Sequence, residues 1–371
     1  MKHLRIARTL AVAWLSMGTV VVFGAAAASG ESDPTAQELT RGMAALISTF
    51  DAGQRDAGLY AFDDDERFDL RLAPLGLEGL RIDEMTDAQW AALEAALGGI
   101  LSPSGLAKLN TIRSLEHEVA AMEGGLFGFL MDRIRLPGRY FLAVFGAPDP
   151  AQPWGLRFDG HHLSLNWTAA PGQPVSVTPL FLGGQPRVVP TQLERAGLRV
   201  LSEEEDRAVA FVNALSASER TAAHVPFTHG SAINRPMSIA GDVPLELGAP
   251  SGIARASLDA SSQARLDAII DVELANFTAA VADRYRARYA EEADSIHFAV
   301  ATADDGALEA GDPFYYRIQS DSFLIEYDNT AEEADHIHVV WRELAGDFGL
   351  AGDFGRDLLG EHLAAHHDSH E

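Results

Sequence analysis

The 371-residue chain contains no cysteine. This absence excludes disulfide bonds and anchoring through a lipidated N-terminal cysteine. Any bound metal ion would therefore have to be held by histidine, aspartate or glutamate side chains. The chain is nevertheless long enough to bury a large hydrophobic core without covalent cross-links.

Basic residues are scarce. The chain has 28 lysines and arginines against 54 aspartates and glutamates, a formal net charge of −26. Proteins bind nucleic acids and anionic lipids through patches of lysine and arginine. We therefore expect no nucleic-acid partner. The negative charge either keeps the protein in solution or attracts cations.

Long apolar runs are missing except near the N-terminus. Residues 1–29 have the pattern of an export signal, in which Lys2, Arg5 and Arg8 precede an apolar segment and a zone of small residues near Ala28. A membrane anchor is the alternative, but the segment is shorter than the ~20 apolar residues that a spanning helix needs. We expect cleavage of the signal, a periplasmic or extracellular location and no membrane association afterwards.

Nucleotide- and haem-binding motifs are absent, since neither Gly-x-Gly-x-x-Gly nor Cys-x-x-Cys-His occurs. We therefore expect no nucleotide cofactor. Two Asp-Phe-Gly triplets, at 347–349 and 353–355, match one kinase motif, but the other kinase motifs are missing. The Gly-x-Ser-x-Gly motif of serine hydrolases is missing as well.

Apolar residues at helical spacing dominate the N-terminal part. An Asp-Pro pair at 33–34 marks the start of one helix, and Thr86 with Gln89 predicts a capping box before another. Ser102 precedes a proline and opens a third helix, which we expect to reach about residue 122.

Further helices are predicted in the second half of the chain. Ser202 and Glu205 match a capping box. Residues 266–289 carry apolar side chains every three or four positions and predict one long helix. A terminal helix is expected over 357–367, and residues 224–257 are expected to form a surface loop.

Alternating or continuous apolar segments predict strands at 139–146, 154–168, 175–182, 295–302, 314–320, 323–327 and 336–341. Because helices come in blocks and strands in hairpins, we predict an α+β fold around an antiparallel sheet. Residues 30–371 are expected to form a single domain, with a helical part over about 33–130 and a part containing the sheet over about 137–371.

Histidines cluster near the C-terminus, where 7 of the 13 lie from His297 onward. In a strand, His336 and His338 would share one face, about 6.5 Å apart. Glu326 and Asp328, on the preceding strand, would approach them through a hairpin-like return. Such a set suits a metal site or a proton-transfer pair, and a structural hydrogen-bond network is the alternative.

A second polar face follows from the segment 154–168. Alternation places His162 and Asn166 on one face, whereas His161 would join apolar side chains unless a bulge turns it. We predict His162 as a third metal ligand or a base, and His161 as either a site residue or a buried structural histidine. In the tail, His362 and His366 share one helix face, as paired metal ligands often do, although such tails are commonly solvated.

The segments WGLRFDGHHLSLNWT, VSVTPLFLGGQP, YYRIQSDSFLIEYDNT, HIHVVWRELAGDFG and RDLLGEHLAAHH resemble the exported family known as Domain of Unknown Function 3500. The resemblance spans about residue 36 to His367 and implies no activity. Its motif blocks fall on His161, His162, Asn166, Glu326, Asp328, Asn329, His336, His338, Trp341, Arg342 and His362. The doubled GDFG and the loop at 224–240 depart from the family pattern.

Three functions remain open. The first is an exported metal-dependent hydrolase of an unknown small molecule, with Zn, Mn, Fe or Cu bound by His162, His336 and His338. In that case Glu326, Asp328 or His161 would act in catalysis, and Asn166, Asn329, Arg342 or His362 would contribute to binding. The others are a non-catalytic periplasmic metal-binding protein and a scaffold without metal.

Overall fold

The computed structural model describes residues 33–70, 76–118, 138–226, 247–303 and 306–350. The expected signal peptide and the expected terminal helix with His362 and His366 lie outside these residues. Within them, no helix has both the length and the apolar character needed to cross a membrane. The described elements belong to one unit, which begins at Ser32.

The structure is built on one mixed, largely antiparallel sheet. The order of its strands is β1-β3-β4-β5-β6-β11-β10-β9-β8-β7, with β2 beside β3. Among the described strands, β1 and β3 pair in parallel and all other neighbours pair antiparallel, while His224 and Val300 form an isolated parallel bridge. The strands are β1 (Leu59–Tyr60), β2 (Leu80–Arg81), β3 (Phe141–Phe145), β4 (Trp154–Gly160), β5 (Leu163–Ala169), β6 (Leu180–Gly184), β7 (Ile253–Ala254), β8 (His297–Thr302), β9 (Phe314–Gln319), β10 (Phe323–Ala331) and β11 (His336–Glu343).

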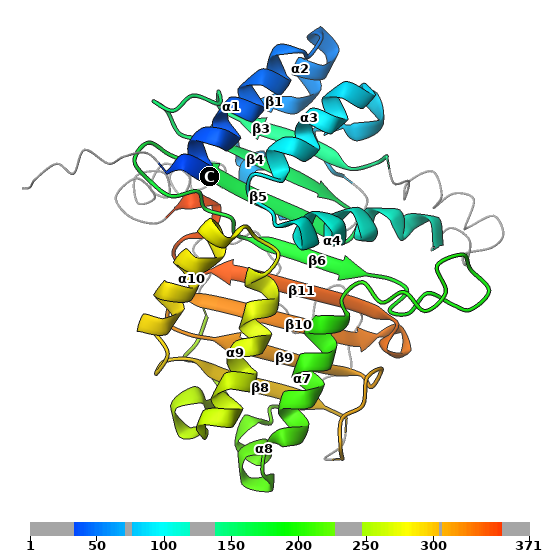
Figure 1. The fold of residues 1–371 in the computed structure, drawn as a ribbon, viewed down its shortest axis with the longest axis vertical. Coiled ribbons are helices and arrows are strands. Elements are labelled where there is room, and N and C mark those ends of the chain that lie inside the picture. The colour runs from blue at the N-terminus through cyan, green and yellow to red at the C-terminus, as the bar shows by residue number, and fades with distance from the viewer. Residues whose placement is uncertain (1–32, 71–75, 119–137, 227–246, 304–305, 351–371) are drawn as a thin grey trace, which may run out of the picture. The chain divides into compact units, whose positions relative to one another are not determined.

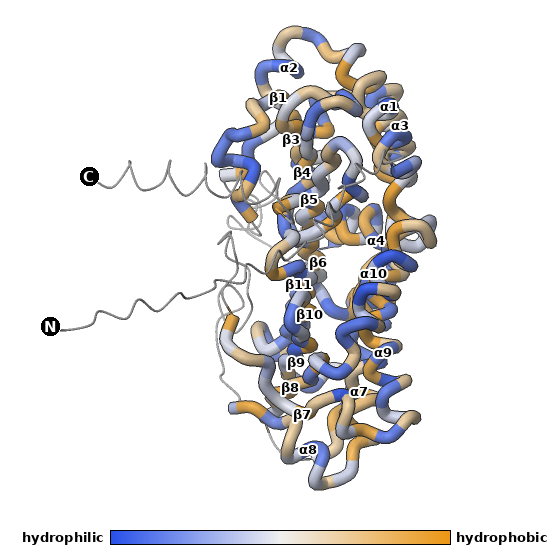
Figure 2. The backbone as a smooth tube through the Cα atoms, turned by 90° about the vertical axis from the view of Figure 1, so that its left-hand side faces the viewer, coloured by the Kyte–Doolittle hydropathy of each residue, from blue (hydrophilic) through white to orange (hydrophobic). Residues whose placement is uncertain are grey.

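Helices cover one face of this sheet (Figures 1 and 2). The helices of the described residues are α1 (Pro34–Ser48), α2 (Ala52–Gly58), α3 (Asp87–Leu97), α4 (Pro103–Ser114), α7 (Ser202–Ala214), α8 (Ala217–Ala223), α9 (Ala260–Leu274) and α10 (Ala279–Glu291). Figure 2 shows α1, α3, α4, α7, α9 and α10 on the same side of the strands. The predicted α+β class with an antiparallel sheet is confirmed.

Local capping chemistry sets several helix starts. The Asp33 carboxylate accepts a hydrogen bond from the Thr35 amide, and Pro34 occupies the first turn of α1. Thr86 and Gln89 form the predicted capping box of α3. Ser102 caps α4 through the Gly105 amide.

Two helix predictions are wrong in detail. The Ser202–Glu205 capping box does not form, because α7 already begins at Ser202 and the buried Glu205 carboxylate instead accepts hydrogen bonds from Arg187 and Arg199. The segment 266–289 is two helices, α9 and α10.

The break between α9 and α10 results from a contact with the N-terminal half of the chain. Phe277 forms an isolated bridge with Leu101, and the Thr278 amide donates to the Ile100 carbonyl. These backbone contacts divert the chain, although the segment contains neither glycine nor proline.

The loop expected over 224–257 ends earlier than predicted. Short elements occupy its last residues, namely β7 and the 3-10 turn η3 (Arg255–Ser257). Similarly, the strand predicted over 175–182 is a regular strand only from Leu180 onward and continues to Gly184, and Ser176 forms a single bridge with Thr168.

The two faces of the sheet differ in character. Residues facing the helices belong to one large hydrophobic core, for example Trp167, Tyr327 and Trp341. The opposite face carries buried polar side chains at alternating positions, including Asn166 and Arg342. Buried polar groups need hydrogen-bond partners. Specific polar interactions therefore hold this face, whereas apolar packing holds the other.

A buried acid with a shifted pKa lies on the helical side of the sheet. Glu273 of α9 is 1% exposed. Burial, together with the nearby charge of Glu204, raises the pKa of Glu273 to about 8, and Lys108 opposes this shift. Because the folded pKa exceeds the unfolded value of about 4.3, protonation of Glu273 favours the folded state.

We expect the stability contributed by this proton to be complete below about pH 4.3 and to be lost as the pH rises toward about 8, by roughly 1.4 kcal/mol per pH unit at most. Glu273→Gln should therefore unfold at higher urea concentration than the wild type at pH 8 and at nearly the same concentration at pH 4.5. Asp271→Asn, an exposed change on the same helix, is the control. Equal pH dependence in Glu273→Gln and wild type would contradict the prediction.

Candidate metal centre

A two-residue turn carries the first histidines of the centre. β4 ends at Gly160 and β5 begins at Leu163, and these two residues are paired, so His161 and His162 form the turn of the hairpin. The predicted strand is therefore interrupted here. His162 has φ 63°, in the left-handed region that histidine adopts more readily than most side chains.

The other two histidines come from a strand that is distant in sequence but adjacent in space. β11 lies between β6 and β10. Its register pairs His338 with Gly183 of β6 and with Asp328 of β10. The start of β11 thereby reaches the hairpin turn of β4 and β5.

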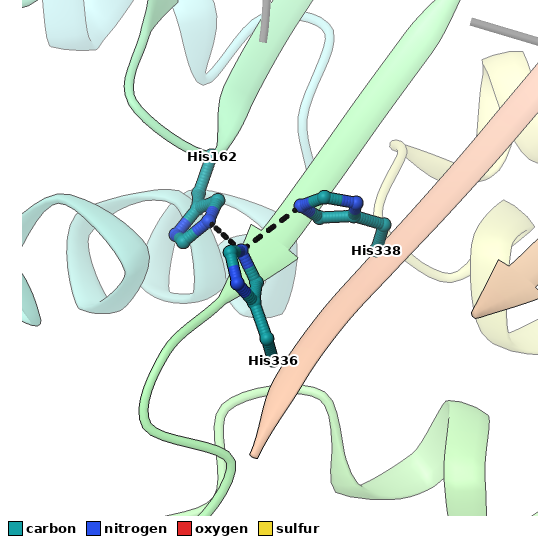
Figure 3. Close-up of side chains that lie close together, drawn as sticks. All are labelled: His162, His336 and His338. Carbon is teal, nitrogen blue, oxygen red and sulfur yellow. Dashed lines mark hydrogen bonds between the residues drawn. The ribbon is translucent and has the colours of Figure 1, made fainter. Parts of the chain in front are cut away.

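His162, His336 and His338 point toward one another (Figure 3). The Nε2 atom of His336 lies 2.7 Å from Nε2 of His162 and 3.1 Å from Nε2 of His338. All three ligand atoms lie within 4.8 Å of one another. His162 and His338 are buried, and the His336 side chain is 12% exposed.

This convergence could hold a cation. Each imidazole nitrogen offers one direction for bonding, either an N–H or a lone pair. The Nε2 atom of His336 faces two other nitrogens and can serve only one of them well. A metal ion accepts three lone pairs at once, and two nitrogens on a tetrahedral zinc lie about 3.3 Å apart, close to the separations found here.

Gly183 makes the close approach possible. It is the register partner of His338, and a Cβ atom added to it would lie 2.8 Å from Cδ2 of His162. Any larger residue would therefore push His162 away from His336 and His338.

Backbone strain concentrates beside the histidines. Among the described residues, five that are not glycine have positive φ, namely His162, Glu332, Glu333, Ala334 and Phe348. The first four belong to the hairpin turn or to η4 (Glu332–Ala334), which leads into β11. A left-handed conformation costs an L-residue about 1–2 kcal/mol. Strain of this kind gathers where a function requires it.

The left-handed turn places a carboxylate next to His336. Glu332 Oε1 lies 3.2 Å from Nδ1 of His336. Histidines that bind metal through one nitrogen commonly donate the other N–H to a carboxylate, which fixes the ring and its tautomer. Phe181 packs edge-on against His338, with ring centroids 5.2 Å apart.

A buried pair adjoins the three histidines on the other side. Glu116, just beyond α4, places Oε1 2.7 Å from Nδ1 of His161. The His161 ring stacks on His162 with centroids 3.8 Å apart. Ligand atoms of Glu116, His161 and His162 lie within 4.8 Å of one another. Sequence reasoning missed Glu116, because nothing near it in the chain distinguishes it from the other acids of a helix.

The two carboxylates predicted for catalysis take different positions. Asp328 is opposite His338 in the register, as the predicted hairpin-like return requires. Burial raises the pKa of Asp328, while hydrogen bonding to Thr330 and the charge of His336 lower it. Glu326 is opposite Val340 instead and bonds to the Tyr315 hydroxyl and the Arg317 guanidinium.

Three of the predicted binding residues have hydrogen-bond or ion-pair partners outside the three-histidine cluster. Asn166 donates to Ser164 Oγ and to the Pro179 carbonyl. Asn329 accepts from the Phe314 amide and donates to the Asp312 carbonyl. Arg342 forms a buried ion pair with Asp347 at 2.5 Å. The fourth predicted binding residue, His362, lies outside the described residues.

Fold and site together define an α+β protein with a cluster of histidines where the start of β11 meets the β4–β5 turn. The family model described as "Protein of unknown function (DUF3500)" matches residues 32–350. The chain therefore belongs to this family. No curated protein and no solved structure matches it significantly.

The strain in η4 yields a stability prediction. Glu333 is exposed and has φ 57°, so glycine at this position should relieve the left-handed strain. We expect Glu333→Gly to raise the free energy of unfolding by about 0.5–1 kcal/mol in urea titrations. Ala287→Gly, at an exposed position inside α10, should lower it by a similar amount. A loss of stability in both variants would show that residue 333 is not strained.

Proposed function

We propose that the protein is exported, that it binds one divalent transition metal through His162, His336 and His338, and that the metal activates water to hydrolyse a small molecule. The observation that carries this proposal is the convergence of the three Nε2 atoms. Neither nucleic acid nor membrane takes part, in keeping with the net charge of −26.

The ligand set favours zinc. Imidazole nitrogens suit Zn, Cu and Fe better than Mg or Ca, and the chain has no thiolate to offer. Three histidines form the protein part of a typical catalytic zinc site, in which water takes the remaining position. Such a metal lowers the pKa of bound water from about 16 to about 7, so that hydroxide is available at neutral pH.

Asp328 is the retained candidate for accepting the proton of that water. It shares the face of the sheet with its register partner His338. Glu326 is a weaker candidate, because Arg317 and Tyr315 engage its carboxylate.

A second function has its own support. The three histidines are largely shielded from solvent. A shielded site suits a protein that holds a metal without turning over a substrate. Metal content tests both functions, and a hydrolysis assay separates them.

We expect protein produced without a histidine tag to bind one equivalent of Zn²⁺, and the double variant His336→Ala/His338→Ala to bind none, as measured by elemental analysis after dialysis. The variant loses two of the three ligands, and a single remaining imidazole should not retain the ion through dialysis.

The control is His224→Ala/His297→Ala, which removes two histidines that lie outside the three-histidine cluster. It should retain the full equivalent. Equal zinc content in all three proteins would show that the metal binds elsewhere, and metal-free wild type would leave only a scaffold function.

We expect the zinc-loaded wild type to hydrolyse p-nitrophenyl acetate faster than its chelator-treated form, since metal-bound hydroxide is a general nucleophile. Asp328→Asn should keep the zinc and lose most of this rate. Full zinc occupancy without any zinc-dependent hydrolysis, of this ester or of a panel of esters, amides and phosphate esters, would favour the binding function.

A further inference from the structure

Glu116 and His161 form a hydrogen-bonded pair in the interior, directly against the three-histidine cluster. Glu116 is 2% exposed and His161 is 6% exposed. One carboxylate oxygen, Oε1, bonds to Nδ1 of His161. The other oxygen, Oε2, is buried and has no hydrogen-bond partner among the described residues. A buried carboxylate oxygen without a partner is costly, so the position calls for a function.

The backbone around His161 is held firmly. The Tyr140 hydroxyl donates to the His161 carbonyl at 2.7 Å. Gly160, directly before the turn, packs against the Tyr140 ring so closely that an added Cβ would lie 2.4 Å from Cδ1. The turn is therefore tightly packed against Tyr140, and both side chains of the pair are buried.

A second metal ion bound by Glu116, His161 and His162 is one use of this arrangement. The stacking of the rings argues against it. An imidazole binds a metal in the plane of its ring, and the rings of His161 and His162 are stacked, with their centroids 3.8 Å apart and their planes tilted by only 25°. Two such planes do not meet within the length of a metal–nitrogen bond, about 2.1 Å.

The arrangement of Glu116 and His161 fits a different role, namely support of a metal ion bound by His162, His336 and His338. Three neutral imidazoles leave the charge of a divalent cation uncompensated, and a buried charge without a partner is strongly unfavourable. Glu116 provides a negative charge next to His162, shielded from water, where Coulomb interactions are strong. The stacked His161 ring also limits how His162 can rotate.

We propose that Glu116 and His161 are positioning residues of the metal centre, which orient His162 and offset the charge of the bound cation. This inference rests on the proposed metal binding. It adds that a carboxylate far from the histidines in sequence sets the affinity of the site.

The test compares Co²⁺ binding to the wild type, Glu116→Gln and His161→Phe, using competition with a chelator and the visible absorption of the bound ion. Glu116→Gln keeps the shape and removes the charge, whereas His161→Phe keeps a flat ring and removes Nδ1. We expect each variant to bind Co²⁺ about 10- to 100-fold more weakly. The absorption bands should shift, because His162 takes a new orientation, and a residue that only stabilises the fold would not change them.

Glu118→Gln is the matched control. It removes the same charge two residues away, where the carboxylate pairs with Arg195, and it should bind Co²⁺ within about twofold of the wild type. Unchanged affinity and spectrum in both positioning variants, or an equal loss in Glu118→Gln, would overturn the inference while leaving the metal centre intact. If Glu116→Gln does not fold, the result for His161→Phe decides. A wild type that binds Co²⁺ no better than His336→Ala/His338→Ala would overturn both proposals.

Discussion

The pairing of β11 with β6 on one side and β10 on the other is the constraint on which the candidate centre depends. β11 comes last among the described strands yet lies in the middle of the sheet. The backbone hydrogen bonds of β11 set which of its residues pairs with which residue of β6 and β10. A shift of this register by one residue would turn His336 and His338 into the hydrophobic core. The same register gives Trp341 and Val339 to the core and thereby uses apolar burial to hold polar residues in place.

The sheet also divides its tasks between two faces. The side under the helices is filled by aromatic and aliphatic residues, which supply most of the stabilisation. The side with the histidines carries ion pairs such as Arg342–Asp347 and Arg317–Glu326. An arrangement of this kind lets one layer of strands provide both a stable support and a polar surface whose groups are held in fixed positions.

Much of the fold could be predicted because its signals are local. The Asp33 cap, the Thr86 capping box and the alternation along β9, β10 and β11 depend on neighbours within a few residues. Alternation along β11 correctly put His336 and His338 on one polar face. His162 does join them, but it lies in a hairpin turn and not on the strand face that alternation assigned to it. Glu116 could not be identified from the sequence, because its contact with His161 depends on where the end of α4 meets the hairpin turn of β4 and β5. The break between α9 and α10 could not be predicted either, because backbone contacts with residues far away in the sequence cause it in a segment without glycine or proline.

The contact between His162 and His336 joins residues 174 positions apart. Because the chain is synthesised from its N-terminus, the cluster cannot assemble until nearly all of the described residues have been made. A cation seated there would tie two halves of the sheet together at their common boundary, and ligands that bind only the native state stabilise it by mass action. Occupancy would thus report that folding has been completed.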